Sequence, residues 1–279
     1  MKIIAAMVTA MAIVKITVLN VSDMYYLVEC LIIKNENQYL IEHITKNAQS
    51  GIEHFYIYDN YSDEPVKTFL EKNAPELLNI CTVELIEYTT RLQIDCYLKF
   101  LSDHRDDTVW CAFFDTDEIV EGNLFDLCKN NEKFLSLKIF QTMHGANGQA
   151  YYDPTKTMTE KFISSITHKP QYYKMVSQVK YVTIQCPHHS YIYAPEIKKE
   201  LWMKHIRQNK AVKLHHYFFK SFEEWLMKIN RGNVLSFIGN QVKLFFEENN
   251  IDDKDRDALL GKYNLKLNDR MLYGNMKRE

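Results

Sequence analysis

Short apolar segments alternate with segments of helical spacing through the first half of the chain. Four segments rich in β-branched, aromatic and other apolar residues have the length of buried strands: residues 26–33, 54–58, 81–86 and 110–114. Three segments between them have helical spacing: residues 36–49, 65–72 and 92–101. Strands joined by helix-length connections form a mostly parallel sheet with helices on both faces. The pattern therefore predicts an α/β fold.

The second half is less regular. Its first predicted elements are, in order, a strand, a loop or lid, a short helix, and short strands around a turn: residues 134–140, 142–153, 159–164 and 172–184. Ser221 and Glu224 have the spacing of a capping box that begins a helix over residues 222–231. A further amphipathic helix is predicted at residues 234–248, and the tail from Asp252 is charged.

Polar residues gather directly after three of the predicted strands. These clusters are residues 34–37, 59–63 and 115–118. In an open α/β sheet, ligands bind beyond the carboxyl ends of the strands. The coincidence of three polar clusters at such positions therefore predicts a binding site at that edge of the sheet.

The main chemical signal is Asp115-Thr116-Asp117, which follows the apolar run 110–114. Alternate residues of an extended chain point to the same side, so the two carboxylates are placed to converge on one ligand. Neighbouring carboxylates repel each other unless a cation neutralises them, and a hard divalent cation prefers oxygen ligands. The alternative is a strand that ends in a solvated acidic turn.

Other polar residues are weaker candidates. Residues 59–63 suit a nucleotide base or ribose, because carboxylates accept hydrogen bonds from sugar hydroxyls and ring N–H groups; the alternative is an Asx turn. Four histidines are possible metal ligands, although a histidine in an apolar strand is more often a packed core residue: His188, His189, His215 and His216. Glu160 is a possible general base or a solvated helix residue.

Composition narrows the class of protein. The chain has 279 residues, enough for one large domain or two small ones, and a formal net charge of −2, which gives no reason to expect nucleic acid as a partner. The basic middle of the chain suits an anionic substrate or membrane surface. The six cysteines are scattered without a CxxC pair, which favours reduced thiols in a reducing compartment.

The N-terminal segment has two interpretations. Its apolar run, residues 3–14, is too short to span a bilayer and resembles the core of a signal peptide. Reduced cysteines argue against export, and Met24 is an alternative start. We therefore treat residues 1–23 as an N-terminal extension outside the fold.

With these clusters in view, the sequence resembles glycosyltransferases of the GT-A fold, most closely those of family 2 and family 92. The matching blocks follow one another over about residues 26–233: CLIIKNE at 30–36, YDNYSD at 58–63, WCAFFDTDE at 110–118, EKF at 160–162, HYFFKS at 216–221, EEW at 223–225 and KINRG at 228–232. Two positions depart from the family 2 pattern. Tyr61 replaces the glycine of the Asp-Asn-Gly-Ser turn, and Ile119 stands where phenylalanine is common.

The resemblance implies a GT-A (Rossmann-like) fold with a C-terminal acceptor-side β/α portion. It implies transfer of a sugar from a nucleotide sugar, with a UDP-sugar as the expected donor, to a glycan or lipid-linked saccharide, with inversion and with Mn²⁺ or Mg²⁺. By this resemblance, Asp115 and Asp117 hold the metal and the donor diphosphate, and His216 is a third metal contact. The nucleotide site contains Glu36 and Asp59, with Asp63 in the same turn.

Family 92 enzymes require a base for the acceptor hydroxyl, for which Glu160 is the first candidate and Glu118 the alternative. We further expect a role in surface polysaccharide biosynthesis, a cytoplasmic location and peripheral association with the inner face of the membrane. The expected division is an extension at 1–23, a nucleotide-sugar-binding half at 24–140, an acceptor and catalytic half at 141–233, and a C-terminal helical tail at 234–279.

Two other functions remain open from the sequence. A phosphatase of the haloacid dehalogenase kind also places a DxD after a strand, although its acids usually lie near the start of the core domain and not in mid-chain. A non-catalytic sugar- or nucleotide-binding module would bind the donor without turning it over. Activity with UDP-sugars, compared with generic phosphate esters, separates the three.

Overall fold

The computed structural model describes residues 24–86, 91–165, 172–186, 188–206, 211–230 and 253–262. The predicted helix at 234–248 and the extension at 1–23 lie outside these residues. The strands are β1 Tyr25–Ile33, β2 His54–Asp59, β3 Cys81–Leu85, β4 Thr108–Ala112, β5 Glu118–Gly122, β6 Ser136–Met143, β7 Tyr173–Gln178, β8 Val182–Cys186, β9 His189–Ile192, β10 Lys204–Ile206 and β11 Val212–His216. The helices are α2 Asn37–Gln49, α3 Val66–Asn73, α4 Leu92–Asp103, α5 Leu124–Lys129, α6 Met158–Lys161, α7 Phe222–Asn230 and α9 Asp253–Lys262. Short 3₁₀ turns are η1 Pro75–Asn79, η2 Val179–Tyr181 and η3 Lys199–Leu201.

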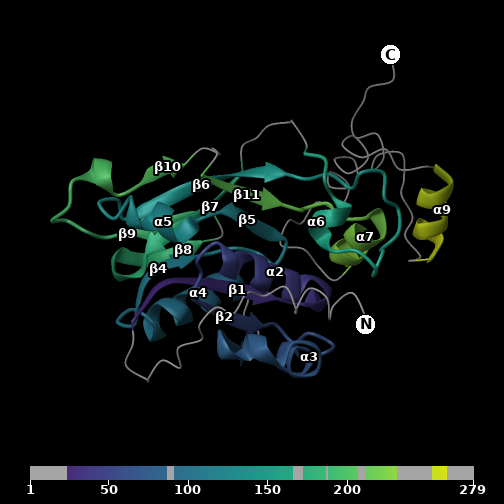
Figure 1. The fold of residues 1–279 in the computed structure, drawn as a ribbon, viewed down its shortest axis with the longest axis horizontal. Coiled ribbons are helices and arrows are strands. Elements are labelled where there is room, and N and C mark those ends of the chain that lie inside the picture. The colour runs from purple at the N-terminus through teal and green to yellow at the C-terminus, as the bar shows by residue number, and fades with distance from the viewer. Residues whose placement is uncertain are drawn as a thin grey trace, which may run out of the picture.

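One large mixed sheet forms the centre of the described structure (Figure 1). Its strand order is β3-β2-β1-β4-β7-β6-β11-β5, with β10 added beside β6. The first four strands in this order pair in parallel, as the β-α alternation predicts. Antiparallel pairs occur where β7 lies between β4 and β6, and where β11 meets β5. The α/β fold with a mostly parallel sheet is confirmed.

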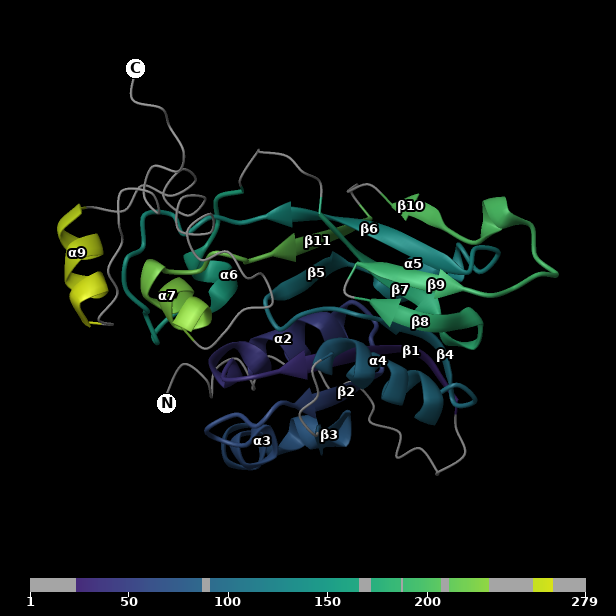
Figure 2. The ribbon, with the colours of Figure 1, turned by 180° about the vertical axis from the view of Figure 1, so that it is seen from behind.

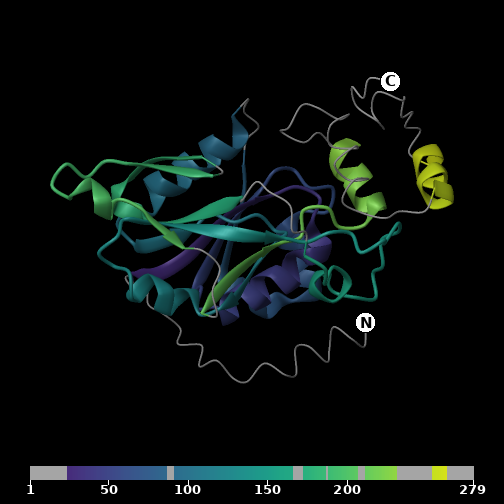
Figure 3. The same cartoon turned by 90° about the horizontal axis from the view of Figure 1, so that it is seen from above.

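Helices cover both faces of the sheet. The side chains of β1 point alternately into two hydrophobic clusters, one on each face. Leu27 and Leu31 belong to the cluster that includes the apolar residues of α2 and α3. Val28 and Cys30 belong to the cluster built around α4. Figures 2 and 3 show α2 and α4 on opposite sides of the sheet. Burial on both faces explains why the strand sequence is continuously apolar.

The end of β4 differs from the extended chain that the sequence pattern suggested. The amide of Glu118 donates to the carbonyl of Asp115 (2.9 Å), so the chain turns at Thr116 and Asp117 and continues directly into β5. The sequence did not predict β5 or the following α5. Only Ile119 and Val120 give β5 an apolar signal, and its first residue is a buried glutamate.

The two predicted halves share one sheet. Strand β6 crosses the predicted division at residues 140/141 and pairs with β7, β10 and β11, which follow it in the chain. All six cysteines are free, and five of them are buried. Within the described ranges, no helix combines the length and apolarity needed to cross a bilayer.

Candidate functional site

The three polar clusters meet at one edge of the sheet, as predicted. Strands β2, β1 and β4 are neighbours that run in parallel, so residues 59–63, 34–37 and 115–118 follow adjacent carboxyl ends. Hydrogen bonds tie the first two clusters together. The amide of Asn35 donates to Ser62 Oγ (3.0 Å), and the amide of Asp63 donates to Asn35 Oδ1 (2.8 Å).

The turn after β2 keeps a left-handed backbone even though glycine is absent. Tyr61 has a φ of +52°, a conformation that glycine adopts freely and that other residues adopt at a cost. Asp59 is buried, and its two oxygens accept the amides of Ser62 and Val66 (both 2.9 Å). These are the contacts of the Asx-turn alternative, extended to the start of α3. The participation of Asp59 in nucleotide binding remains a prediction.

Asp117 is surrounded by cationic side chains from the distant C-terminal part of the chain. Its Oδ1 lies 3.4 Å from His216 Nε2 at the end of β11. Its Oδ2 lies 3.1 Å from Lys228 Nζ and 3.5 Å from Lys220 Nζ. Burial opposes ionisation of Asp117, but the two lysines and His216 outweigh it and hold the pKa of Asp117 well below its usual value.

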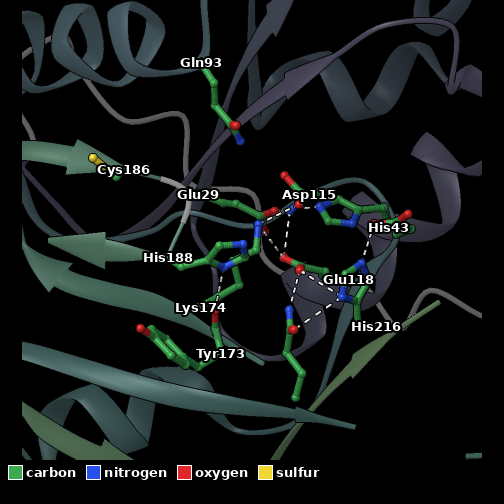
Figure 4. Close-up of polar contacts among 12 residues, drawn as sticks. Glu29, His43, Gln93, Asp115, Glu118, Tyr173, Lys174, Cys186, His188 and His216 are labelled. Atoms are coloured by element: carbon green, nitrogen blue, oxygen red, sulfur yellow. Dashed lines mark hydrogen bonds and ion pairs between the residues drawn. The ribbon is translucent and has the colours of Figure 1, made fainter. Parts of the chain in front are cut away.

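Asp115 faces a different partner. Lys174 on β7 is fully buried, and its Nζ lies 2.6 Å from Asp115 Oδ2 and 3.4 Å from Glu118 Oε2 (Figure 4). Burial opposes ionisation of Asp115, but the Lys174 ammonium outweighs it, so the pKa of Asp115 is lowered. The two acids of the DxD are thus neighbours with separate counter-ions.

Glu118 has the surroundings of a structural side chain. It is completely buried, accepts the amide of Asp115 (2.9 Å) and a hydrogen bond from Gln141, and lies 3.6 Å from His216 Nδ1. Burial raises the pKa of Glu118 to about 7, although the Lys174 ammonium acts in the opposite direction. A pKa of this size suits a general base. The Glu118 carboxylate is buried, however, so an acceptor substrate does not reach it in this conformation.

A buried group of polar side chains, which the sequence did not predict, supports the DxD turn. Glu29 on β1 accepts hydrogen bonds from His43 (2.6 Å) and Asn47 (3.1 Å) on α2. Asn47 also donates to the carbonyl of Glu118 (3.2 Å) and accepts the amide of Val120 (2.9 Å). The signal in the sequence was the lone charge of Glu29 within the apolar run 26–33.

A small cleft opens beside Asp117, between the loop after β1 and α7. Its lining combines acids, lysines and apolar residues: Asn35, Glu36, Gln38, Phe219, Lys220, Glu224, Met227 and Lys228. Lys220 has a left-handed backbone (φ +55°), and its Nζ lies 3.4 Å from Glu36 Oε2 as well as near Asp117. The structure thus brings the predicted nucleotide residue Glu36 next to the predicted metal ligand Asp117.

Helix α7 is fixed in place by the capping box that the sequence predicts. Glu224 accepts hydrogen bonds from the amide (3.2 Å) and the hydroxyl (2.6 Å) of Ser221. The hydroxyl of Tyr39 on α2 also donates to Glu224, and Lys161 Nζ donates to Tyr39 Oη (2.8 Å). These contacts hold α7, which carries Lys228, against the first half of the chain.

The other predicted residues have their own partners. Glu160 Oε2 accepts the amide (2.8 Å) and hydroxyl (2.9 Å) of Thr157 in a capping box of α6, as expected for the solvated-helix alternative. His215 bonds to His144 (2.9 Å) and Glu121 (3.0 Å). Asp63 is exposed and accepts a bond from Asn35 Nδ2 (3.1 Å). The catalytic role of Glu160 remains a prediction.

The site can hold a divalent cation only with help from a ligand. No group of three or more His, Cys, Asp or Glu side chains within the described residues is arranged to bind an ion. Asp117 Oδ1 and His216 Nε2, however, face each other at 3.4 Å. A carboxylate oxygen and an imidazole nitrogen suit Mn²⁺, and a Mg²⁺-type ion is commonly bound by one or two carboxylates together with substrate phosphates. The residues present therefore fit a cation that a phosphate helps to coordinate.

Comparison with known proteins gives no family assignment. No protein-family profile and no curated protein sequence matches the chain. Among solved structures, the chain is similar to HddC from Yersinia pseudotuberculosis, over 75% of this chain and 99% of that one, with 8% identity and a TM-score of 0.44. It is also similar to S. aureus TarS, over 85% of this chain and 42% of that one, with 12% identity and a TM-score of 0.42. The complex of TarS 1-349 with UDP gives 85% and 70% coverage, 12% identity and a TM-score of 0.40. Function is inferred below from the residues of the site.

Proposed function

We propose that this protein is a metal-dependent glycosyltransferase that moves a sugar from a nucleotide sugar, with UDP-sugars as the first donors to test, to a glycan or lipid-linked saccharide. The observation that carries the proposal is the arrangement around Asp117. A buried carboxylate faces an imidazole on one oxygen and two ammonium groups on the other, beside a cleft at the carboxyl edge of the sheet. This arrangement suits a cation bound together with a diphosphate.

The residues predicted from the sequence divide into two groups in this proposal, one for the nucleoside and one for the cation. The loops after β1 and β2, with Glu36, Asp59 and Asp63, face the nucleoside. Asp117 and His216 would hold the cation, with Asp115 next to them. When bound, the cation would neutralise charge that develops on the departing diphosphate.

Lys220 and Lys228 lie within reach of the same phosphates. Both ammonium groups contact Asp117 Oδ2 and line the cleft. Ammonium groups form strong, charge-assisted hydrogen bonds with phosphate oxygens. A ligand that carries its own negative charge can therefore replace Asp117 as their partner, and the two lysines then orient the diphosphate.

The proposal also needs a base that takes the proton of the acceptor hydroxyl. The two carboxylates predicted as the base, Glu118 and Glu160, are respectively buried and engaged in a helix cap. Both carboxylates are therefore targets for substitution.

Release of free UDP from UDP-sugars, with and without Mn²⁺, tests the proposal directly. We expect UDP release that depends on Mn²⁺ and is lost in Asp117→Ala with the fold retained. Hydrolysis of generic phosphate esters without UDP release would support the phosphatase alternative. Binding of UDP with no turnover under any condition would support the binding module.

A further inference from the structure

A second histidine near the DxD turn, His188, lies in the turn between β8 and β9. His188 Nδ1 lies 2.9 Å from the carbonyl oxygen of Tyr173. A carbonyl oxygen only accepts hydrogen bonds, so Nδ1 carries the proton of this contact. In the neutral ring the other nitrogen, Nε2, then holds a free lone pair. The backbone thus selects the tautomer of His188 that can accept a proton.

The position of His188 follows from its neighbours along β7. Tyr173 is adjacent in sequence to Lys174, whose Nζ contacts Asp115 and Glu118. Figure 4 shows the His188 ring beside Lys174, with the edge opposite the Tyr173 carbonyl turned toward Lys174 and Asp115. His188 is exposed, in contrast to Glu118. The ring therefore lies near the DxD turn, on a residue that is exposed to solvent.

The charges around His188 favour the neutral ring. Burial of part of the ring and the Lys174 ammonium lower its pKa below the usual value, and His216 acts in the same direction more weakly. The Asp115 carboxylate acts in the opposite direction, which would stabilise an imidazolium once it forms. A neutral imidazole with a carboxylate nearby has the electrostatics of a general base.

We propose that His188 is the catalytic base that accepts the proton of the acceptor hydroxyl through Nε2, an inference that rests on the proposed glycosyltransferase function. A bond forms between the acceptor oxygen and the anomeric carbon of the donor. The bond between that carbon and the phosphate oxygen breaks, and its electron pair leaves with the nucleoside diphosphate. The acceptor proton ends on Nε2, and the imidazolium returns it to solvent.

A purely structural role for His188 makes a different prediction. If the ring only anchors the β8–β9 turn to Tyr173, a glutamine that can donate to the same carbonyl should preserve function. If Nε2 accepts a proton, glutamine should fail, because an amide is not a base. Added imidazole should also restore activity to His188→Ala, since it supplies the missing base.

The test compares the full-length wild type with His188→Gln and His188→Ala. UDP release from UDP-glucose, UDP-galactose and UDP-N-acetylglucosamine is measured with Mn²⁺ and water as the acceptor, and UDP binding is measured by calorimetry. We expect turnover to fall by about 100-fold in both variants while UDP affinity is unchanged, with partial recovery of His188→Ala by imidazole. The adjacent His189→Gln, whose ring packs on Tyr191, is the matched control and should behave as wild type.

The outcomes separate the base from the function on which it rests. Two results would overturn the role of His188 without affecting the proposed function. One is full UDP release by both His188 variants when the wild type is active. The other is a loss of UDP release in His188→Ala that added imidazole does not restore. A wild type that neither binds UDP nor releases it from any of the three donors would overturn the proposed function, and the base with it.

Discussion

At the residue scale, the proposed site is built on a few buried charges that lie next to groups of opposite charge. Asp117 is almost completely buried, and the ammonium groups of Lys220 and Lys228 together with His216 hold its pKa well below the usual value, so its charge is retained at neutral pH. An isolated carboxylate with this burial would be strongly destabilised. Buried charges held in place by several partners are common where a site must bind a charged ligand.

Replacement of Asp117 by asparagine should abolish the cation site while keeping the shape of the side chain. We expect Mn²⁺-dependent UDP release to fall by about 100-fold, because the charge that faces His216 is lost. Exposed Asp106→Asn is the matched control and should retain full turnover. Wild-type turnover in Asp117→Asn would show that this carboxylate does not hold the ion.

Glu118→Gln should change how stability depends on pH. Burial raises the pKa of Glu118 to about 7 from a usual value of 4.5, so the folded state binds this proton more tightly than the unfolded state. The corresponding stability is complete below the unfolded pKa and is lost as pH rises through about 7. Glutamine stays neutral, so the melting temperature of Glu118→Gln should improve relative to wild type between about pH 5 and pH 8. A difference that stays constant over this range would contradict the raised pKa.

At the element scale, Lys220 and the helix that follows it, α7, bring two ammonium groups to Asp117. Lys220 and Lys228 pair with Asp117, and both line the cleft in which the proposal places the diphosphate. A cation that binds Asp117 must therefore displace or share these ammonium groups. The same groups then become donors for the phosphates.

Lys228→Ala should have opposite effects on the two ligands. We expect Mn²⁺ alone to bind more tightly, because one competing ammonium is gone, and UDP with Mn²⁺ to bind about tenfold more weakly, because one charged contact to phosphate is lost. Calorimetric titration with each ligand measures both. Lys67→Ala on the exposed face of α3 is the control. Weaker binding of Mn²⁺ alone, or unchanged UDP affinity, would contradict this exchange.

Asn47 on α2 should be important for stability because it supports the DxD turn through three hydrogen bonds. Asn47→Ala leaves buried groups of Glu29, Glu118 and Val120 without this partner, so we expect a loss of about 2–3 kcal/mol in the free energy of unfolding. Asn73→Ala removes a single bond to the Phe69 carbonyl and should cost about 1 kcal/mol or less. Urea denaturation measures the free energy of unfolding of both variants. Equal losses in Asn47→Ala and Asn73→Ala would contradict a special role of Asn47 in stability.

The elements differ in how far the sequence predicts them. Strands β1 to β4 and helices α2 to α4 were predicted because apolar residues recur there with a clear period. Strand β5 was missed because ion pairs and not apolar contacts bury its first residue, Glu118. The turn at Thr116 was not predicted either, because an extended chain is the simplest continuation of β4.

At the scale of the whole molecule, residues far apart in sequence assemble the site. The three strand-end clusters could be predicted, since adjacent parallel strands bring their carboxyl ends together. His216 lies 3.4 Å from Asp117, and its predicted role as a metal contact remains a prediction. Lys174, Lys220 and Lys228 were not assigned to the site, because their place depends on how β7 and α7 pack against the first half. Local patterns do not contain that information.

The most direct test of the central claim is a thermal-shift panel of UDP-, GDP- and CDP-sugars, each with and without Mn²⁺. A ligand that binds only the folded protein raises the melting temperature, by an amount that corresponds to about 2.7 kcal/mol at 100 times its dissociation constant. We expect one nucleotide class, UDP, to stabilise the wild type in the presence of Mn²⁺, with little effect when Mn²⁺ is omitted or Asp117 is replaced by asparagine. No shift with any nucleotide sugar, or equal shifts in the wild type and Asp117→Asn, would contradict a metal and diphosphate site at Asp117.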